Sequence, residues 1–347
     1  TTKRLADIYA IDNYKTRGLP LSPKAIVVKP DVGATPSLDR HHHHAYIRPD
    51  IWWNEVDGIK AGLHMEADYM QTMHKTEATL WWNTHIGQSV PYQSFANEGW
   101  YDKYAAINYN IKYVSPVTRF NPKLQLQLHS KSLDGLWYHK GGFNWDINRQ
   151  NSIQFYAQTM WRPVSADLDY LLYRNEWSSM RAKPNSSLNI SWKRDMKFVN
   201  GIGNITLTAR APFMTNDFNY GYLQLESKHY QSLHKLDIRT RIFGRYGTGS
   251  SIPYESALFL AGANPEELMD NKYTRSITGV IPYQYYAASQ NNNAYLHMGG
   301  GLNLRGYSGY LVAEQRNGQV LIGYKDRSGA AANAEVDFDR YIPLRPK

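Results

Sequence analysis

Histidines and carboxylates that fall close together in the chain are the first candidates for chemistry. His64, Glu66, His74, Glu77 and His85 follow one another within a short stretch. On neighbouring strands such side chains would converge at one end of a barrel, where imidazole and carboxylate groups could hold a metal ion. Nothing in their spacing selects them over other pairs, and a barrel interior freely admits polar residues. We therefore interpret them as polar residues of a lumen.

The motifs of several enzyme classes are absent from the chain. No histidine is followed directly by glutamate, so there is no H-E-x-x-H zinc motif, and G-x-S-x-G, the P-loop and the dinucleotide fingerprint are missing as well. We predict no catalytic residue, no metal ligand and no cofactor in this chain. Serine–histidine catalysis by residues along strands would leave little local signature, so a hydrolase built on the strands stays open as an alternative.

The opening segment, residues 1–45, differs from the rest of the chain. Lys3 to Tyr14 has the composition of a short helix, after which Pro20, Pro23, Pro30 and Pro36 interrupt regular structure. The run His41 to His44 closes this segment. Consecutive histidines rarely converge on one ion without a shaped site, so we predict an exposed linker.

From Tyr46 onward apolar and polar residues alternate, which is typical of half-buried strands. Leu124, Leu126 and Leu128 alternate with Gln125, Gln127 and His129. The same period runs through residues 188–193, 204–210 and 235–242, and further strands are predicted at 58–69, 75–87, 104–114, 152–161, 168–177 and 218–230. The sequence thus predicts an all-β fold, antiparallel and mostly up-and-down, with about eleven or twelve strands.

Composition favours a transmembrane β-barrel over a soluble β protein, which remains the alternative. The chain has 347 residues, 27 Tyr and 10 Trp, with a mean hydropathy of −0.58. Aromatic residues are expected at strand ends, at Trp52 and Trp53, Trp81 and Trp82, Trp137, Trp161 and Trp192, where indole rings favour the headgroup layer. No apolar run is long enough for a transmembrane helix, but barrel strands need only ~9–11 residues each. Cysteine is absent, so there is no disulfide.

The formal net charge of +9 does not indicate nucleic-acid binding. Binding to nucleic acid requires Lys and Arg clustered beside stacking aromatics. In this chain they alternate singly with apolar residues along the predicted strands, as they would on the wall of a polar lumen.

The strand pattern lapses over residues 249–319, which is too long for a hairpin loop and therefore indicates a functional or a disordered segment. A helical turn is predicted at 264–269. The segment ends in a glycine-rich motif whose arginine offers a fork for a carboxylate within the lumen. The motif residues are Gly300, Gly301, Leu304, Arg305, Gly306 and Tyr307.

Leu304-Arg305-Gly306-Tyr307 resembles the (V/I/L)-R-G-(F/Y) signature of the outer-membrane surface-antigen superfamily, which includes barrel-assembly proteins and two-partner-secretion transporters. The resemblance implies a sixteen-stranded barrel, whose later strands would follow the end of this chain. It also implies that the long loop folds into the lumen and that Arg305 pairs with an acid of the barrel wall. Glu335, Asp337 and Asp339 are nearby in sequence, but none is singled out.

A second resemblance covers Lys3 to Ile8, Arg48 to Asn54 and Asp57 to His64, which are similar to the C-terminal barrel of Bacteroidota outer-membrane proteins. Those proteins carry a gluzincin aminopeptidase-type domain before the barrel. The resemblance implies that residues 1–45 are a periplasmic lead-in and residues 46–347 the barrel. Because the zinc motif is absent, any peptidase domain would lie outside this chain, and whether the protein is an enzyme stays open.

Together these patterns predict a barrel of the Gram-negative outer membrane that anchors a periplasmic metallopeptidase-like domain and takes part in outer-membrane protein assembly. The expected partners are outer-membrane lipid or lipopolysaccharide and other outer-membrane proteins or a barrel-assembly complex, without nucleic acid. The alternative is a transport or secretion pore, in which the loop constricts a water-filled channel instead of plugging it.

Overall fold

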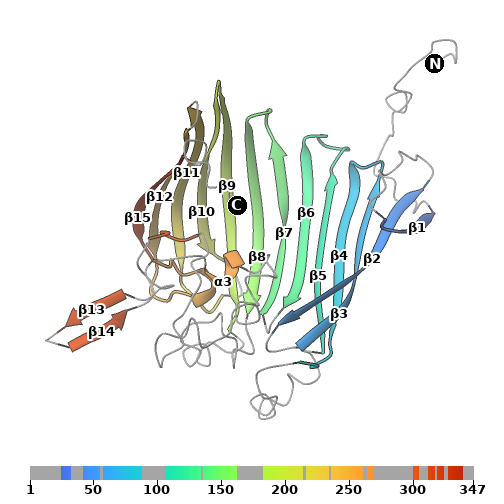
Figure 1. Cartoon of the computed structure of the whole chain (residues 1–347), viewed down its shortest axis with the longest axis horizontal. Coiled ribbons are helices and arrows are strands. Elements are labelled where there is room, and N and C mark those ends of the chain that lie inside the picture. Colours follow the sequence, from blue (N-terminus) through green and yellow to red (C-terminus); the bar gives the residue numbers. More distant parts are fainter. Residues whose placement is uncertain are drawn as a thin grey trace, which may run out of the picture.

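The computed structural model describes residues 25–32, 42–54, 58–87, 106–133, 136–161, 183–213, 216–233, 236–260, 264–268, 300–304, 312–316, 319–323 and 327–338. They form an all-β structure dominated by one sheet of thirteen strands, in which neighbours in sequence are neighbours in the sheet (Figure 1). The pairing is antiparallel throughout, except that β1 runs parallel to β2. Among the described residues, no helix is long and apolar enough to cross a membrane.

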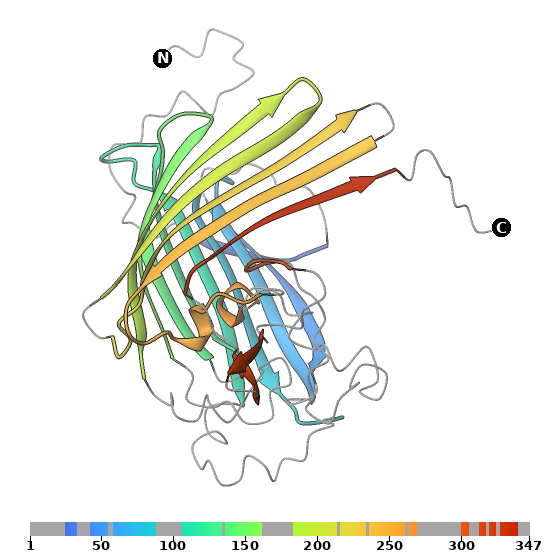
Figure 2. The same cartoon turned by 90° about the vertical axis from the view of Figure 1, so that its left-hand side faces the viewer.

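The sheet strands in order are β1 (Ile26–Pro30), β2 (His43–Asn54), β3 (Gly58–Tyr69), β4 (Met73–Asn83), β5 (Ile107–Pro116), β6 (Leu124–Leu133), β7 (Leu136–Asp146), β8 (Asn151–Trp161), β9 (Asn185–Phe198), β10 (Gly201–Pro212), β11 (Gly221–Leu233), β12 (Leu236–Thr248) and β15 (Gly329–Asp337). A separate hairpin contains β13 (Val312–Arg316) and β14 (Gln319–Gly323). Two short helical segments, η3 (Tyr254–Ser256) and α3 (Pro265–Leu268), follow β12. Figure 2 shows the sheet curling, with α3 on its concave side.

Apolar and polar residues alternate along each strand, and successive side chains of a strand point to opposite sides of the sheet. The sheet therefore has an apolar face and a polar face. Cross-strand register keeps each face continuous. Leu207, for example, is paired with Trp192 on one side and with Leu225 on the other. The neighbouring Thr206 is paired with Lys193 and Glu226 on the polar face.

Large apolar side chains of the apolar face are exposed along the whole sheet. Leu80 is 54% exposed, Phe155 50% and Ile242 58%, on three well-separated strands. Scattered apolar residues are normal on a protein surface, but a contiguous patch of this extent marks a surface that contacts lipid or another apolar partner.

The two ends of the sheet differ in how they connect the strands. Short connections, residues 70–72, 117–123, 147–150 and 199–200, lie at one end, which we call the turn end and which is uppermost in Figure 1. The long connections 84–106, 162–184 and 249–328 lie at the opposite end, the loop end, together with the shorter connections 55–57, 134–135 and 213–220.

Aromatic side chains mark two levels of the apolar face. Near the loop end, Trp137 stacks on Trp161, with ring centroids 5.7 Å apart, and meets Tyr109 edge-on. Near the turn end, Trp145 and Trp192 flank Ile153 in the pairing register. From Trp137 to Trp145 along β7 is about 26 Å at ~3.3 Å per residue. Trp192 thus lies well inside its strand and not at the predicted end, but it is level with Trp145.

The predicted strands agree well with the structure where they can be compared. The interval 58–69 matches β3, and those at 75–87, 104–114, 152–161 and 218–230 overlap β4, β5, β8 and β11. The interval 168–177 lies outside the described residues. Alternation does not reveal β1 or β7, so the sheet has more strands than predicted. In β7, Gly141 and Gly142 interrupt the pattern, and Trp137 and Tyr138 place aromatics on both faces.

The described end of the histidine run is not an exposed linker, contrary to the sequence prediction. His43 and His44 begin β2, and His44 is only 5% exposed. Strand β1 also lies within the predicted lead-in and pairs with β2. The region predicted as a helix, Lys3 to Tyr14, lies outside the described residues.

Candidate functional site

The segment that follows β12 folds back onto the polar face of the sheet. Leu258 and Leu302 pack with Phe243 of β12 into a buried apolar cluster, against which Leu260 and Leu304 are also packed. Two backbone hydrogen bonds join its two parts, from Leu302 N to the Phe259 carbonyl (3.0 Å) and from Leu304 N to the Leu260 carbonyl (2.8 Å). We call residues 254–260, 264–268 and 300–304 the docked loop.

A buried ion pair ties the docked loop to the wall of the sheet. Nη1 of Arg210, on β10, lies 3.2 Å from Oε2 of Glu266, in α3, and the Arg210 side chain is 1% exposed. Nη2 of Arg210 donates to Oδ1 of Asn185 at 2.6 Å. The guanidinium also lies over the rings of Tyr220 and Tyr222. Such a charge is stable in a buried site only when it is paired and hydrogen-bonded.

Glu266 receives two further hydrogen bonds. Nε2 of Gln158, on β8, donates to Oε1 at 2.6 Å, and the Ser256 hydroxyl donates to Oε2 at 2.7 Å. Burial raises the pKa of the Glu266 carboxyl, but the Arg210 charge and these two bonds outweigh burial, so its pKa lies below the ordinary value. The carboxylate is therefore charged at neutral pH, when it holds β8, β10 and the loop together.

The local sequence explains why Glu266 can reach this position. The backbone N–H of Glu267 donates to Oδ1 of Asn264, and the N–H of Asn264 donates to Oε2 of Glu267, both at 2.9 Å. This reciprocal pair is a capping box, which fixes the first turn of a helix. Nδ2 of Asn264 donates to the Ala257 carbonyl at 3.0 Å, so the turn is also held to the preceding part of the loop.

Two more arginines of β12 bind backbone carbonyls of the docked loop. Nη1 of Arg245 donates to the Ser256 carbonyl at 3.2 Å, while its Nε donates to Gln224. Nη2 of Arg241 donates to the Gly301 carbonyl at 2.8 Å, and its Nε donates to Glu226 at 2.6 Å. Each of these side chains therefore bonds both the wall and the loop.

The predicted glycine-rich motif begins inside this docked loop. Gly301 and Asn303 have φ values of 51° and 55°, a left-handed conformation that glycine and asparagine tolerate. The Asn303 carbonyl accepts a hydrogen bond from Asn333 of β15 at 3.1 Å. Leu304 lies on the polar face beside a cavity of about 880 Å³, which Arg239, Arg241 and Glu335 also line. Arg305, Gly306 and Tyr307 lie outside the described residues, and so does the predicted pairing of Arg305.

The histidines and acids singled out for metal binding do not converge. His64 bonds Thr79 and Glu66 on the polar face, and Glu77 pairs with Lys112 at 3.7 Å. His74 points to the other face, where Nδ1 lies 2.6 Å from the Tyr113 hydroxyl. In the part of the chain that the structure describes, no three His, Asp or Glu side chains gather as a metal site.

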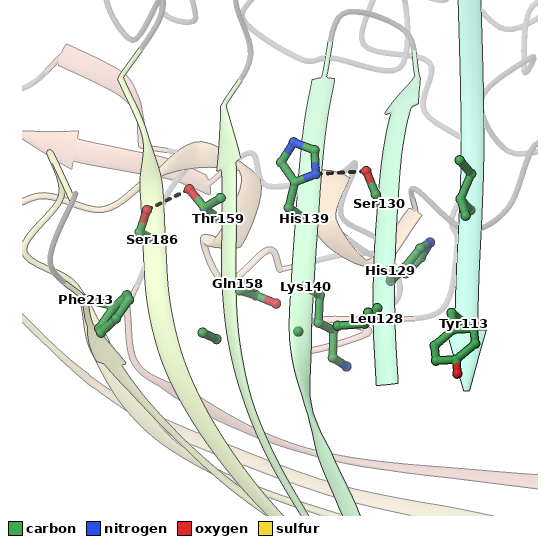
Figure 3. Close-up of a pocket in the computed structure, with 13 residues that line it drawn as sticks. Tyr113, Leu128, His129, Ser130, His139, Lys140, Gln158, Thr159, Ser186 and Phe213 are labelled. Atoms are coloured by element: carbon green, nitrogen blue, oxygen red, sulfur yellow. Dashed lines mark hydrogen bonds between the residues drawn. The ribbon is translucent and has the colours of Figure 1, made fainter. Parts of the chain in front are cut away.

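One serine and one histidine of the described chain lie close enough for serine–histidine chemistry to be considered. Oγ of Ser130 lies 2.9 Å from Nδ1 of His139 on the apolar face (Figure 3). Among the described residues, no carboxylate or amide side chain hydrogen-bonds to His139. The pair thus lacks the third group that orients the base in a catalytic triad.

Sequence reasoning missed the residues that hold the loop, above all Arg210 and Glu266. It expected an arginine of the loop and an acid of the wall, whereas the described contact joins an arginine of the wall to an acid of the loop. Asn264 and Glu267 offered a signal, because their spacing is that of a capping box.

The chain matches no protein-family model, and no curated protein matches it.

Proposed function

We propose that this chain is a β-barrel of the bacterial outer membrane whose docked loop occupies the lumen. One observation carries the proposal. The long strands expose apolar side chains on one face of the sheet, and the loop is docked on the opposite, polar face. Lipid-facing and lumen-facing residues alternate in this way in transmembrane barrels. The nine residues from Trp137 to Trp145 are close to the ~9–11 residues with which a tilted barrel strand crosses a membrane.

The turn end of the sheet fits the periplasmic side of the membrane. Outer-membrane barrels have short periplasmic turns and longer extracellular loops. Strand β2 begins at the turn end, so a domain that precedes it would lie in the periplasm. This placement supports the function that the two sequence resemblances imply. The barrel anchors a periplasmic metallopeptidase-like domain, contacts outer-membrane lipid or lipopolysaccharide, and takes part in handling other outer-membrane proteins.

Two measurements on the protein in its native membrane test this proposal. Detergent-extracted protein should migrate differently on a gel before and after boiling, because a closed barrel resists the detergent until it is heated. Residues such as Leu80, Phe155 and Ile242, replaced singly by cysteine, should react with lipid-soluble but not with water-soluble thiol reagents. Recovery in the soluble fraction without detergent would overturn the membrane assignment.

Anchoring needs a test of its own. In cells, zinc-dependent aminopeptidase activity associated with this protein should sediment with outer membranes and move to the soluble periplasmic fraction when the barrel is deleted. Activity that stays with the membranes after the deletion would contradict the anchoring role.

A transport pore is the second candidate, because a part of the polar face away from the docked loop carries half-exposed charges. Lys112 is 36% and Glu77 47% exposed there, as expected for side chains that line water. Single-channel recording in a planar bilayer separates the two functions: a stable open conductance favours transport, and rare brief openings favour a plugged lumen.

A further inference from the structure

The apolar face carries one row of polar side chains across four neighbouring strands. The pairing register places Ser130, His139, Thr159 and Ser186 side by side on β6, β7, β8 and β9. They form two hydrogen-bonded pairs, Ser130 with His139 at 2.9 Å and Thr159 with Ser186 at 2.7 Å (Figure 3). Ser186 is buried at 1% exposure, whereas Ser130, His139 and Thr159 are partly exposed on this face. Polar groups that face lipid are costly, so these three side chains point to a function.

The depth of this polar row follows from the same register. Trp137 and Trp161 lie two residues nearer the loop end than His139 and Thr159, about 7 Å along the strands. On the other side of the row lie Leu128, Gly141 and Ala157. The polar row thus separates the aromatic level from the apolar band, at the depth where lipid headgroups give way to acyl chains.

A groove runs beneath the polar row because two of the residues there are small. Its volume is about 530 Å³, and Gly141 and Ala157, which we call its floor, are among its lining residues. Tyr113 and Phe213, labelled in Figure 3, also line the groove. A Cβ added to Gly141 would meet only the Leu128 side chain, at 3.4 Å. The floor is therefore open on the lipid-facing side.

His139 leaves one polar atom available at this groove. Its Nδ1 is engaged with Ser130, while in the described part of the chain nothing hydrogen-bonds its Nε2. Lys140 also lines the groove, but its ammonium lies over the Tyr156 ring, 3.8 Å from the centroid, on the polar face. The groove thus offers hydroxyl and imidazole groups without a cation, which suits an ester better than a phosphate.

We propose that this groove binds one ester-linked acyl chain of a membrane lipid, with the ester group of that chain hydrogen-bonded at the polar row. The inference rests on the proposed membrane location. The apolar floor takes the chain, and the row supplies polar partners where the ester would otherwise face protein carbon. Bound lipid would also give Nε2 of His139 a hydrogen-bond partner that the described part of the chain does not provide.

Photolabelling in vesicles tests the site. The purified full chain is reconstituted into vesicles of phosphatidylethanolamine that carries a photoreactive group on its acyl chain, irradiated, digested and mapped by mass spectrometry. Labels should be enriched at Leu128, Gly141 and Ala157 over Leu223 and Leu225 on the same face. Labels spread evenly over the apolar face would overturn the groove but leave the membrane proposal standing. The absence of labels from the whole face would overturn both.

Matched variants sharpen the result. Ala157→Leu fills the floor and should abolish the enrichment, whereas Ala209→Leu, on the same face of β10, should leave it unchanged. His139→Phe keeps a ring of similar shape and should weaken lipid retention in native mass spectrometry by about fivefold, the loss expected for one net hydrogen bond. Equal retention by all three variants and the unmodified protein would overturn the proposal.

Discussion

The two faces of the sheet come from one alternating pattern but depend on different physics. On the apolar face, side chains such as Leu207 and Leu225 lie beside other apolar residues and are exposed, with no specific partner required. On the polar face, Arg210 has a specific partner for each terminal nitrogen. The apolar face thus tolerates any change that stays apolar, while the polar face tolerates few changes at its buried charges.

A charged residue therefore has opposite effects on stability on the two faces. In the proposed membrane location, a charge added to the apolar face would meet hydrocarbon, and its cost would be set by its depth in the membrane. A charge removed from beneath the docked loop leaves its former partner buried without compensation. Substitutions can therefore be paired across the sheet to test the assignment of each face.

The largest effect is expected where the docked loop meets the wall. Glu266→Ala leaves the Arg210 guanidinium buried and unpaired, which should weaken docking of the loop by about 3–5 kcal/mol. Limited proteolysis in detergent should then cleave within residues 250–304, while far-ultraviolet circular dichroism shows the strands intact. Glu267→Ala in the same helical turn is the matched control, because it removes a cap contribution of about 1 kcal/mol and a charge interaction with Arg245 but leaves the Arg210–Glu266 pair intact.

A double variant decides whether the effect belongs to the pair. Arg210→Met combined with Glu266→Ala should cost less than the sum of the two single changes, since no charge is then left unpaired. Additive costs would show that the two residues act independently.

The next effect compares adjacent residues on opposite faces of β10. Leu207→Arg should destabilise the protein in vesicles by about 2–4 kcal/mol, because arginine would face the bilayer interior. Thr206→Arg places the same side chain on the polar face beside Glu226 and should change stability by no more than about 0.5 kcal/mol. Urea titration of folded protein in vesicles measures both, and equal costs would contradict the assignment of the faces.

A smaller effect is expected from acid, and its sign follows from Glu266. The pKa of this carboxyl is lowered on docking, so its contribution is complete above the ordinary glutamate pKa and is lost as pH falls through the lowered value. The loop should therefore stay protease-resistant through mildly acidic pH. In Arg210→Met, burial alone would raise the pKa of Glu266, and docking should weaken at a higher pH than in the unmodified protein.

Much of the sheet can be predicted from the sequence because the type of each residue, apolar or polar, depends mainly on the face that it occupies. The run from Gly58 to Tyr69 is predicted to the residue. The capped turn α3 falls within the interval predicted for it. Strand β7 escapes detection, since its glycines and its aromatics on both faces hide the period.

The contacts of the docked loop could not be predicted in the same way. Arg210 and Glu266 are far apart in the chain, and nothing in their local sequence distinguishes them from other charges of the polar face. His44 illustrates the same limit, because a run of histidines carries no sign that its last members begin a strand. The contact between Arg210 and Glu266 depends on the strand register and on where the loop folds back onto the sheet. Both are properties of the whole sheet and cannot be predicted from local sequence.

The smallest effect concerns an arginine of the polar face away from the docked loop. Arg48 pairs with Asp31, which follows β1, and with Glu66 at 3.3 Å, but its side chain is 44% exposed. Exposed ion pairs contribute at most about 1 kcal/mol and are screened by salt. Arg48→Ala should therefore speed hydrogen exchange of the β1 amides only at low ionic strength and leave the loop protected. Arg48 and Arg210 differ in that only Arg210 is buried beneath the docked loop. If Arg48→Ala proved as costly as Glu266→Ala, which removes the partner of Arg210, this burial would not explain the strength of the Arg210–Glu266 contact.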